Sequence, residues 1–150
     1  MSDNYIRFIP EELNDRLDLQ ETLKIKSLDS YGRITVNESE KIEFADAGSN
    51  FESVSCPCCG AQLMEWWGEA MEAAWDGQGF ISLNITTPCC GKEMSLHNLN
   101  YYFNQGFYKV MVELEPEILK PLLWDEIAES IKQELIQITG YEWRIVYAHY

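Results

Sequence analysis

The feature that most constrains this chain is a cysteine-containing turn that occurs twice. Residues 56–60 read Cys-Pro-Cys-Cys-Gly and residues 87–91 read Thr-Pro-Cys-Cys-Gly, and together they hold all five cysteines of the chain. Cys56 and Cys59 have the Cys-x-x-Cys spacing that lets two thiolates face one metal ion, and the glycine that follows permits a tight turn. The pair of turns therefore predicts a Zn²⁺ site that joins two segments far apart in the sequence.

The fourth ligand of this site is ambiguous, because Thr87 stands where a regular pair of turns would have a cysteine. Threonine is a poor zinc ligand, so another side chain has to complete the site. Cys89 is the first choice, and Cys58 and His97 are the alternatives. We predict a structural Zn²⁺ held by four thiolates: Cys56, Cys59, Cys89 and Cys90.

The cysteines allow three further interpretations. The turns could lack a metal, or two thiols could form a disulfide, although clustered cysteines in a chain without a secretory signal bind metal more often. A catalytic zinc would have three protein ligands and an open position with a base nearby. These interpretations stay open as alternatives to the structural site.

Length and composition favour one folded domain. The chain has 150 residues, of which 46% are apolar, and this is enough for a hydrophobic core. We expect a single domain over residues 1–150, with an N-terminal arm and strands in residues 1–50 and the main sheet with two helices in residues 51–150. Neither a secretory signal nor a membrane helix is apparent, so a cytoplasmic location is expected.

The charge balance narrows the choice of partners. Acidic residues outnumber basic residues by 25 to 11, which gives a net charge of −14. Affinity for nucleic-acid phosphates depends on lysine and arginine, so direct nucleic-acid binding and attraction to an anionic membrane are both disfavoured. A strongly acidic chain favours fast association with a basic protein partner.

Residues 61–76 give the clearest helical pattern. Apolar side chains recur at helical spacing and form one stripe, which we expect in the core: Leu63, Trp66, Trp67, Ala70, Met71, Ala74 and Trp75. Acidic side chains occupy the opposite side and form an acidic stripe: Glu65, Glu69, Glu72 and Asp76. Residues 119–139 form the second predicted helix, with Pro121 in its first turn and Gly140 at its C-terminal cap.

The remaining patterns predict strands and an α+β fold. Residues 1–20 are expected to form an arm with a short helix from Pro10, and residues 22–28 a strand that precedes strands at 34–36 and 41–45. From residue 51 the order is strand, helix, strand, strand, helix, strand: 51–55, 61–76, 80–86, 107–115, 119–139 and 141–150. This order is that of a ferredoxin-like split βαβ sheet, here with a zinc-bound pair of turns and an N-terminal β extension.

Residues 42–150 resemble a family of uncharacterised small bacterial proteins. The likeness rests on the Cys-Pro-x-Cys-Gly turn, the tryptophan-rich helix, the Thr-Thr-Pro-Cys-Cys-Gly turn followed by Ser-Leu, and a C-terminal end like Tyr-Ala-His-Tyr. The turns themselves are similar to the CPxCG turns of zinc ribbons and treble-clef modules. The resemblance implies a metal site and no particular activity. Family members with asparagine near position 97 imply that Cys89, rather than His97, is a ligand.

The expected function is that of a non-enzymatic zinc protein that binds a basic protein through its acidic surface, as an immunity protein or inhibitor does. The chain has only two histidines, His97 and His149, and no phosphate-binding glycine loop. One alternative is a nucleic-acid- or transcription-associated zinc ribbon protein, which would need a basic patch. The other is a hydrolase with an open zinc site, which would need a carboxylate near the metal.

Overall fold

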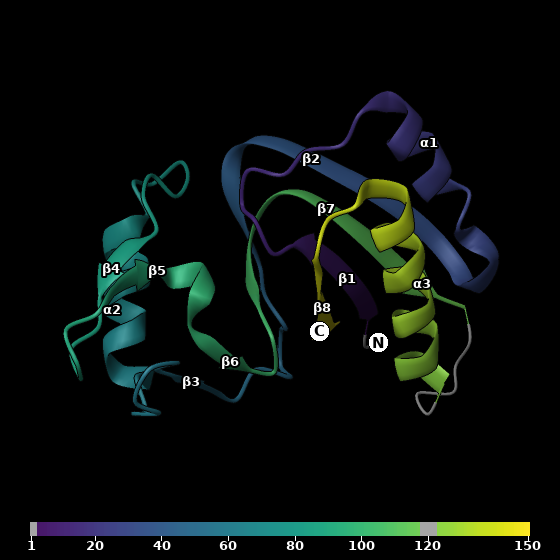
Figure 1. Ribbon diagram of the computed structural model, residues 1–150. Coiled ribbons are helices and arrows are strands. Elements are labelled where there is room, and N and C mark those ends of the chain that lie inside the picture. The colour runs from purple at the N-terminus through teal and green to yellow at the C-terminus, as the bar shows by residue number, and fades with distance from the viewer. Residues whose placement is uncertain (1–2, 118–122) are drawn as a thin grey trace.

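The computed structural model describes residues 3–117 and 123–150, and it places them in a mixed α/β fold with antiparallel sheets and three α-helices (Figure 1). The main sheet has four strands in the order β2-β7-β1-β8, and each neighbouring pair is antiparallel. These strands are β1 (Asn4–Pro10), β2 (Gly32–Ala45), β7 (Gly106–Pro116) and β8 (Trp143–His149). The mixed α/β content and the antiparallel pairing agree with the fold class expected from the sequence.

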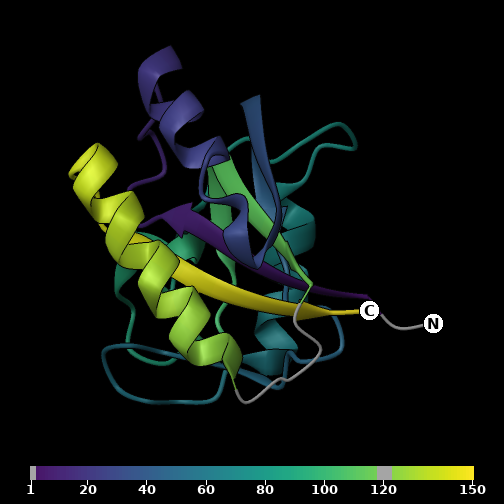
Figure 2. The ribbon, with the colours of Figure 1, turned by 90° about the vertical axis from the view of Figure 1, so that its right-hand side faces the viewer.

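Helices α1 (Leu19–Lys26) and α3 (Trp124–Thr139) cover one face of this sheet, as Figure 2 shows. Ile127, Ile131 and Leu135 of α3 recur every four residues and are buried against Phe8 and other side chains of the sheet. Burying one such side chain contributes about 1.5–3 kcal/mol, so this face anchors both helices. The helical pattern predicted for residues 119–139 is confirmed from Trp124 onward, and Pro121 lies outside the described residues.

A second unit, the cysteine module (residues 46–105), is inserted between the paired strands β2 and β7, and it lies to the left of the main sheet in Figure 1. It contains helix α2 (Met64–Ala74) and two small antiparallel sheets. The strands are β3 (Ser53–Ser55) with β6 (Asn100–Tyr102), and β4 (Asn84–Thr86) with β5 (Glu93–Ser95). Two 3₁₀ turns complete the chain's helical segments in the described ranges, η1 (Asp29–Tyr31) and η2 (Leu96–Asn98).

The cysteine module has its own hydrophobic core, which continues into the end of the main sheet. Trp67 of α2 packs against Phe51 and Tyr101, and its indole N–H donates to the Tyr101 hydroxyl at 3.3 Å. The Tyr101 hydroxyl donates in turn to the carbonyl of Leu96. Phe107 of β7 is buried in the same cluster, so the two cores meet at this strand. Trp75 differs from the expected core stripe, because 46% of its surface is exposed.

The ferredoxin-like order predicted from residue 51 is not the observed topology. The strands at 51–55 and 80–86 were expected to join the main sheet, but among the strands of the described ranges β3 pairs only with β6 and β4 only with β5. Each of them has three residues, and their apolar side chains pack inside the cysteine module. The places they were expected to fill in the main sheet are taken by β1 and β2.

In the N-terminal part, the strands expected at 34–36 and 41–45 lie within β2, whereas the expectations for residues 1–28 are wrong. The predicted arm contains β1, an interior strand whose Ile6, Phe8 and Ile9 are fully buried. Residues 22–28 are mostly helical instead of extended, since α1 begins at a capping box in which Asp18 and Glu21 each accept a backbone N–H from the other. Within the described part of the chain, no helix has the length and apolar character needed to cross a membrane.

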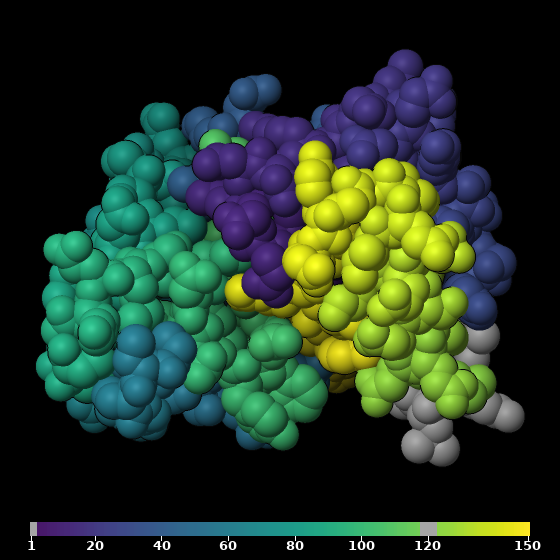
Figure 3. Space-filling model, in the orientation of Figure 1, coloured from purple at the N-terminus to yellow at the C-terminus, as the bar shows by residue number. Residues whose placement is uncertain are grey.

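The segment after β1 joins the cysteine module to the main sheet. Leu13 packs against the core of the module, and Glu11 forms an ion pair with Arg144 of β8 at 2.8 Å. In Figure 3 the purple N-terminal part of the chain lies between the teal and green module and the yellow C-terminal part. The two units therefore share a packed junction.

Candidate metal centre

The two turns have the same backbone hydrogen bonds. In the first, the Cys56 N–H donates to the Ala61 carbonyl and the Gly60 N–H donates to the Cys56 carbonyl, both at 2.9 Å. In the second, Thr87 takes the place of Cys56 in the same two bonds, also at 2.9 Å. The fifth residue of each turn has a left-handed backbone, with φ of +75° at Gly60 and +66° at Gly91, which glycine adopts without strain.

This repeated geometry brings the predicted ligands together. The sulfurs of four cysteines lie within 4.8 Å of one another: Cys56, Cys59, Cys89 and Cys90. The Cys56 and Cys90 sulfurs are 3.7 Å apart, and the adjacent Cys89 and Cys90 sulfurs are 3.9 Å apart. Four thiols this close could hold a metal ion. Strands β3 and β4 lead into the first and second turns, and β5 follows the second turn.

The spacing of the sulfurs suits Zn²⁺. A tetrahedral zinc with metal–sulfur bonds of about 2.3 Å has sulfurs about 3.8 Å apart along each edge of the tetrahedron. Two of the separations, 3.7 and 3.9 Å, agree with that edge. In the described ranges the group contains thiols only, without a carboxylate or an imidazole. Four thiolates fill all four positions of a zinc ion, and this is the pattern of a structural site rather than an open catalytic one.

The backbone of the first turn stabilises a thiolate. The N–H groups of Cys59 and Cys58 point at the Cys56 sulfur and lower the pKa of this thiol to about 6. Loss of solvation raises the pKa of the Cys89 thiol to about 12, and hydrogen bonds from its sulfur to neighbouring sulfurs act in the same direction. Like charges this close repel, so a cation among the sulfurs would stabilise neighbouring thiolates.

Thr87 and Cys58, the two residues that made the ligand set ambiguous, both lie outside the group of four sulfurs. The Thr87 side chain is buried, and its hydroxyl accepts the Lys92 N–H at 3.1 Å and lies 3.4 Å from the Cys90 sulfur. Thr87 thus stabilises the second turn by hydrogen bonds, at the position that Cys56 occupies in the first turn. Cys58 is exposed at the tip of its turn.

His97 is also placed away from the cysteines, in the junction between the two units. Its Nδ1 accepts the Phe107 N–H at 2.9 Å, and its Nε2 donates to the Glu11 carbonyl at 3.0 Å. Burial, with a further effect from Arg144, lowers the pKa of His97 to about 4. Both ring nitrogens of the neutral imidazole form hydrogen bonds within the protein, so His97 stabilises the fold at this junction.

Arg144 completes this junction and was not singled out by the sequence. It binds both carboxylate oxygens of Glu11 and donates to the carbonyls of His97 and Gln105 at 3.0 and 2.7 Å. Burial raises the pKa of Glu11, but the hydrogen bond and the positive charge of Arg144, with smaller charge effects, together outweigh it, so the pKa is lowered. Gly106 leaves no room here, because a Cβ atom would lie 2.7 Å from Arg144 and 2.8 Å from His97. No local pattern marks a contact between residues so far apart in the sequence.

Comparison with protein-family models, with curated proteins and with solved structures gave no match to this chain. The assignment of the site therefore rests on its own geometry.

Proposed function

We propose that the chain binds one structural Zn²⁺ through Cys56, Cys59, Cys89 and Cys90. The observation that carries this proposal is the approach of four sulfurs to within 4.8 Å of one another, from turns that are far apart in the sequence. The metal would supply the positive charge that four adjacent thiolates need. Since the unfolded chain has no preformed site, the free energy of zinc binding would add to the stability of the cysteine module.

Metal content tests this directly. Protein purified without a chelator is expected to contain about one zinc ion per chain, because the four sulfurs provide one complete tetrahedral site. Inductively coupled plasma mass spectrometry gives the metal content, and a thiol assay gives the protection of the cysteines before and after zinc removal. A zinc content well below half an equivalent, with freely reactive thiols, would contradict the proposal.

We propose further that this zinc protein acts in the cytoplasm by binding a basic partner protein through the acidic surface of the cysteine module, as an inhibitor or immunity protein would. The module has seven acidic residues and one basic residue, Lys92: Asp46, Glu52, Glu65, Glu69, Glu72, Asp76 and Glu93. Four of them form the acidic stripe, three on α2 and Asp76 just after it, and all four are exposed. Residues 42–150 resemble a family of uncharacterised small bacterial proteins with similar cysteine turns, and this resemblance implies a metal site but no particular activity.

One member of the acidic stripe also has a local role. Asp76 accepts the backbone N–H groups of Gln78 and Gly79, each at 2.8 Å, and so closes the turn after α2. These two bonds lower its pKa. Glu65, Glu69 and Glu72 are thus the residues whose charge can be removed without disturbing this turn.

The acidic surface is tested with a basic probe, a short peptide in which lysine and valine alternate. Replacing Glu65, Glu69 and Glu72 by glutamine is expected to slow association with this peptide and to flatten its dependence on salt, because steering by charge is lost. The matched control replaces Glu126, Glu129 and Glu134 of α3, which are also exposed. Stopped-flow kinetics at two salt concentrations gives both quantities. Equal rates for the two triple variants would contradict a role for the α2 surface.

A further inference from the structure

A groove runs between α2 and β4, beside the cysteine cluster. One hollow in it, of about 370 Å³, is lined by Trp66, Ala70 and Ala73 of α2 and by Ser82, Asn84 and Thr86 on the other side. A second hollow, of about 320 Å³, also borders Trp66 and continues to Pro88 and Cys89. The groove therefore follows β4 along its length and ends at the second cysteine turn.

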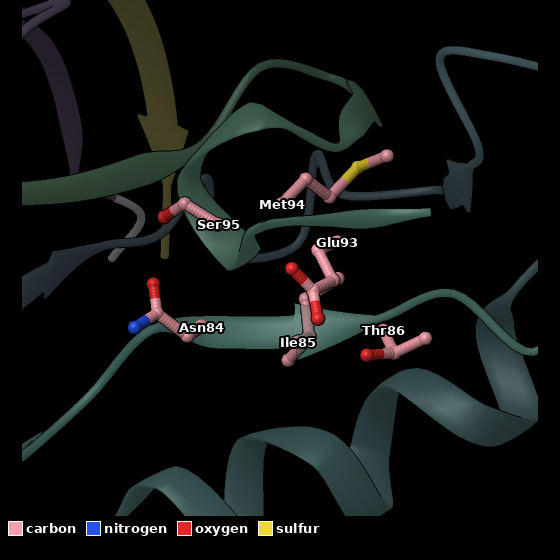
Figure 4. Close-up of a pocket in the computed structure, with 6 residues that line it drawn as sticks. All are labelled: Asn84, Ile85, Thr86, Glu93, Met94 and Ser95. Carbon is pink, nitrogen blue, oxygen red and sulfur yellow. The ribbon is translucent and has the colours of Figure 1, made fainter. Parts of the chain in front are cut away.

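The wall that β4 contributes is an unpaired strand edge. In the described ranges β4 pairs only with β5, and Figure 4 shows it lying between β5 and a helix. Leu83 and Thr87 form their backbone hydrogen bonds on the side of β5. The Leu83 carbonyl accepts the Leu96 N–H at 2.8 Å, and the Thr87 N–H donates to the Lys92 carbonyl at 2.9 Å. Because alternate residues of an antiparallel strand bond to opposite sides, Asn84 and Thr86 direct their backbone groups to the free edge.

The free edge still has hydrogen-bonding capacity. The Asn84 N–H is taken by the Ser82 hydroxyl at 3.3 Å. Within residues 3–117 and 123–150, this leaves the Asn84 carbonyl and both backbone groups of Thr86 for a neighbouring strand. An exposed strand edge beside a groove is the arrangement to which an extended peptide adds as a further strand.

The charge around the groove selects the kind of peptide. Glu65 lines the end of the groove that is nearest the second cysteine turn. Glu69 lies on α2 about one helical turn from both Trp66 and Ala73. On the hairpin, Glu93 extends from β5 towards β4 over a third hollow, of about 540 Å³ (Figure 4). Trp66 and the alanines of α2 make the helix side of the groove apolar. Of the three carboxylates, Glu65 lines the groove itself, Glu69 adjoins it on α2, and Glu93 lies over the neighbouring hollow of the hairpin.

We propose that this groove binds an extended basic segment of a partner protein, which adds to the free edge of β4 as a third strand. This inference rests on the proposed function, since it names the place where the acidic surface receives its partner. Alternate side chains of the added strand would point to opposite faces. Apolar ones would meet Trp66 and the alanines of α2, and lysine or arginine side chains would meet the carboxylates. A second copy of this chain suits the groove poorly, because each copy carries a net charge of −14.

The test measures binding of the alternating lysine–valine peptide to the zinc-loaded full chain by calorimetry at low salt. Ala73→Lys places a positive charge in the groove on an exposed helical position, and Ser130→Lys makes the same change on the exposed face of α3. We expect Ala73→Lys to weaken binding about tenfold or more and Ser130→Lys less than about twofold. A peptide N-methylated at alternate residues keeps its charge but cannot pair with a strand, so it is expected to bind about tenfold more weakly as well.

Three results would overturn the inference: equal binding by the two lysine variants, equal binding by the methylated peptide, or no binding of the lysine–valine peptide. Self-association of the free chain that Ala73→Lys abolishes would also overturn it, because the occupant would then be a second copy. The failure of the groove can be told from that of the acidic surface. Suppose that removing the charges of Glu65, Glu69 and Glu72 slows association of the peptide, while Ala73→Lys and Ser130→Lys bind it equally well. The acidic surface would then be supported and the groove would be ruled out.

Discussion

Cys56→Ser is expected to abolish zinc binding and to lower the thermal unfolding midpoint by roughly 10 °C or more. Cys56 is buried at 1% exposure and its sulfur lies 3.7 Å from that of Cys90, so serine in its place leaves the site one ligand short. A hydroxyl is a poor zinc ligand, and loss of the proposed zinc would lower the stability of the cysteine module by several kcal/mol. For a chain of this size, about 1 kcal/mol corresponds to a shift of about 2–4 °C. Zinc content and circular dichroism melting measure both effects.

The other cysteines provide a matched series for this prediction. Cys59→Ser and Cys89→Ser are expected to behave like Cys56→Ser, since all three sulfurs belong to the group of four. Cys58→Ser is the control, because Cys58 is one of the five cysteines yet stands outside that group. The assignment of Cys89 is wrong if Cys89→Ser retains zinc while Cys58→Ser or His97→Ala loses it.

The candidate site could be predicted from the sequence because its information is local. A Cys-x-x-Cys turn closed by glycine defines its own backbone, and the second turn repeats the pattern over five residues. The choice of Cys89 over Thr87 needed only the chemistry of zinc ligands. The Cys89 sulfur lies within the group of four, and Thr87 lies outside it.

The topology could not be predicted in the same way, because it depends on pairings between distant residues. Short strands such as β3 and β4 have the same alternation whether they join a large sheet or pair locally. In β1 the apolar residues Ile6, Phe8 and Ile9 form only a brief pattern, and the strands that pair with them come from the C-terminal half of the chain. The helix α1, where a strand was predicted, could have been recognised from the sequence, because Asp18 and Glu21 have the spacing of a capping box.

The second large effect is expected from the pH dependence of folding at His97. The folded protein keeps this imidazole neutral, with Nδ1 accepting the Phe107 N–H and Nε2 donating to the Glu11 carbonyl. Its pKa is lowered to about 4, whereas the unfolded chain protonates histidine at about 6.5. Between these values the unfolded state binds a proton that the folded state does not, so the free energy of unfolding falls as the pH is lowered from 6.5 to 4.

The size of this contribution is on the order of 3 kcal/mol, present in full above pH 6.5 and lost by about pH 4. Urea unfolding of the zinc-loaded protein between pH 7.5 and pH 4 measures it, with zinc content followed in parallel because thiolate protonation also releases metal. His97→Gln is expected to be less stable than the wild type at pH 7.5 and to show a shallower pH dependence, so that the two stability curves converge towards pH 4. The carboxylates and cysteines titrate in both proteins, and the difference between the curves therefore isolates His97. Parallel curves would show that His97 is not held neutral by the junction of Phe107, Glu11 and Arg144.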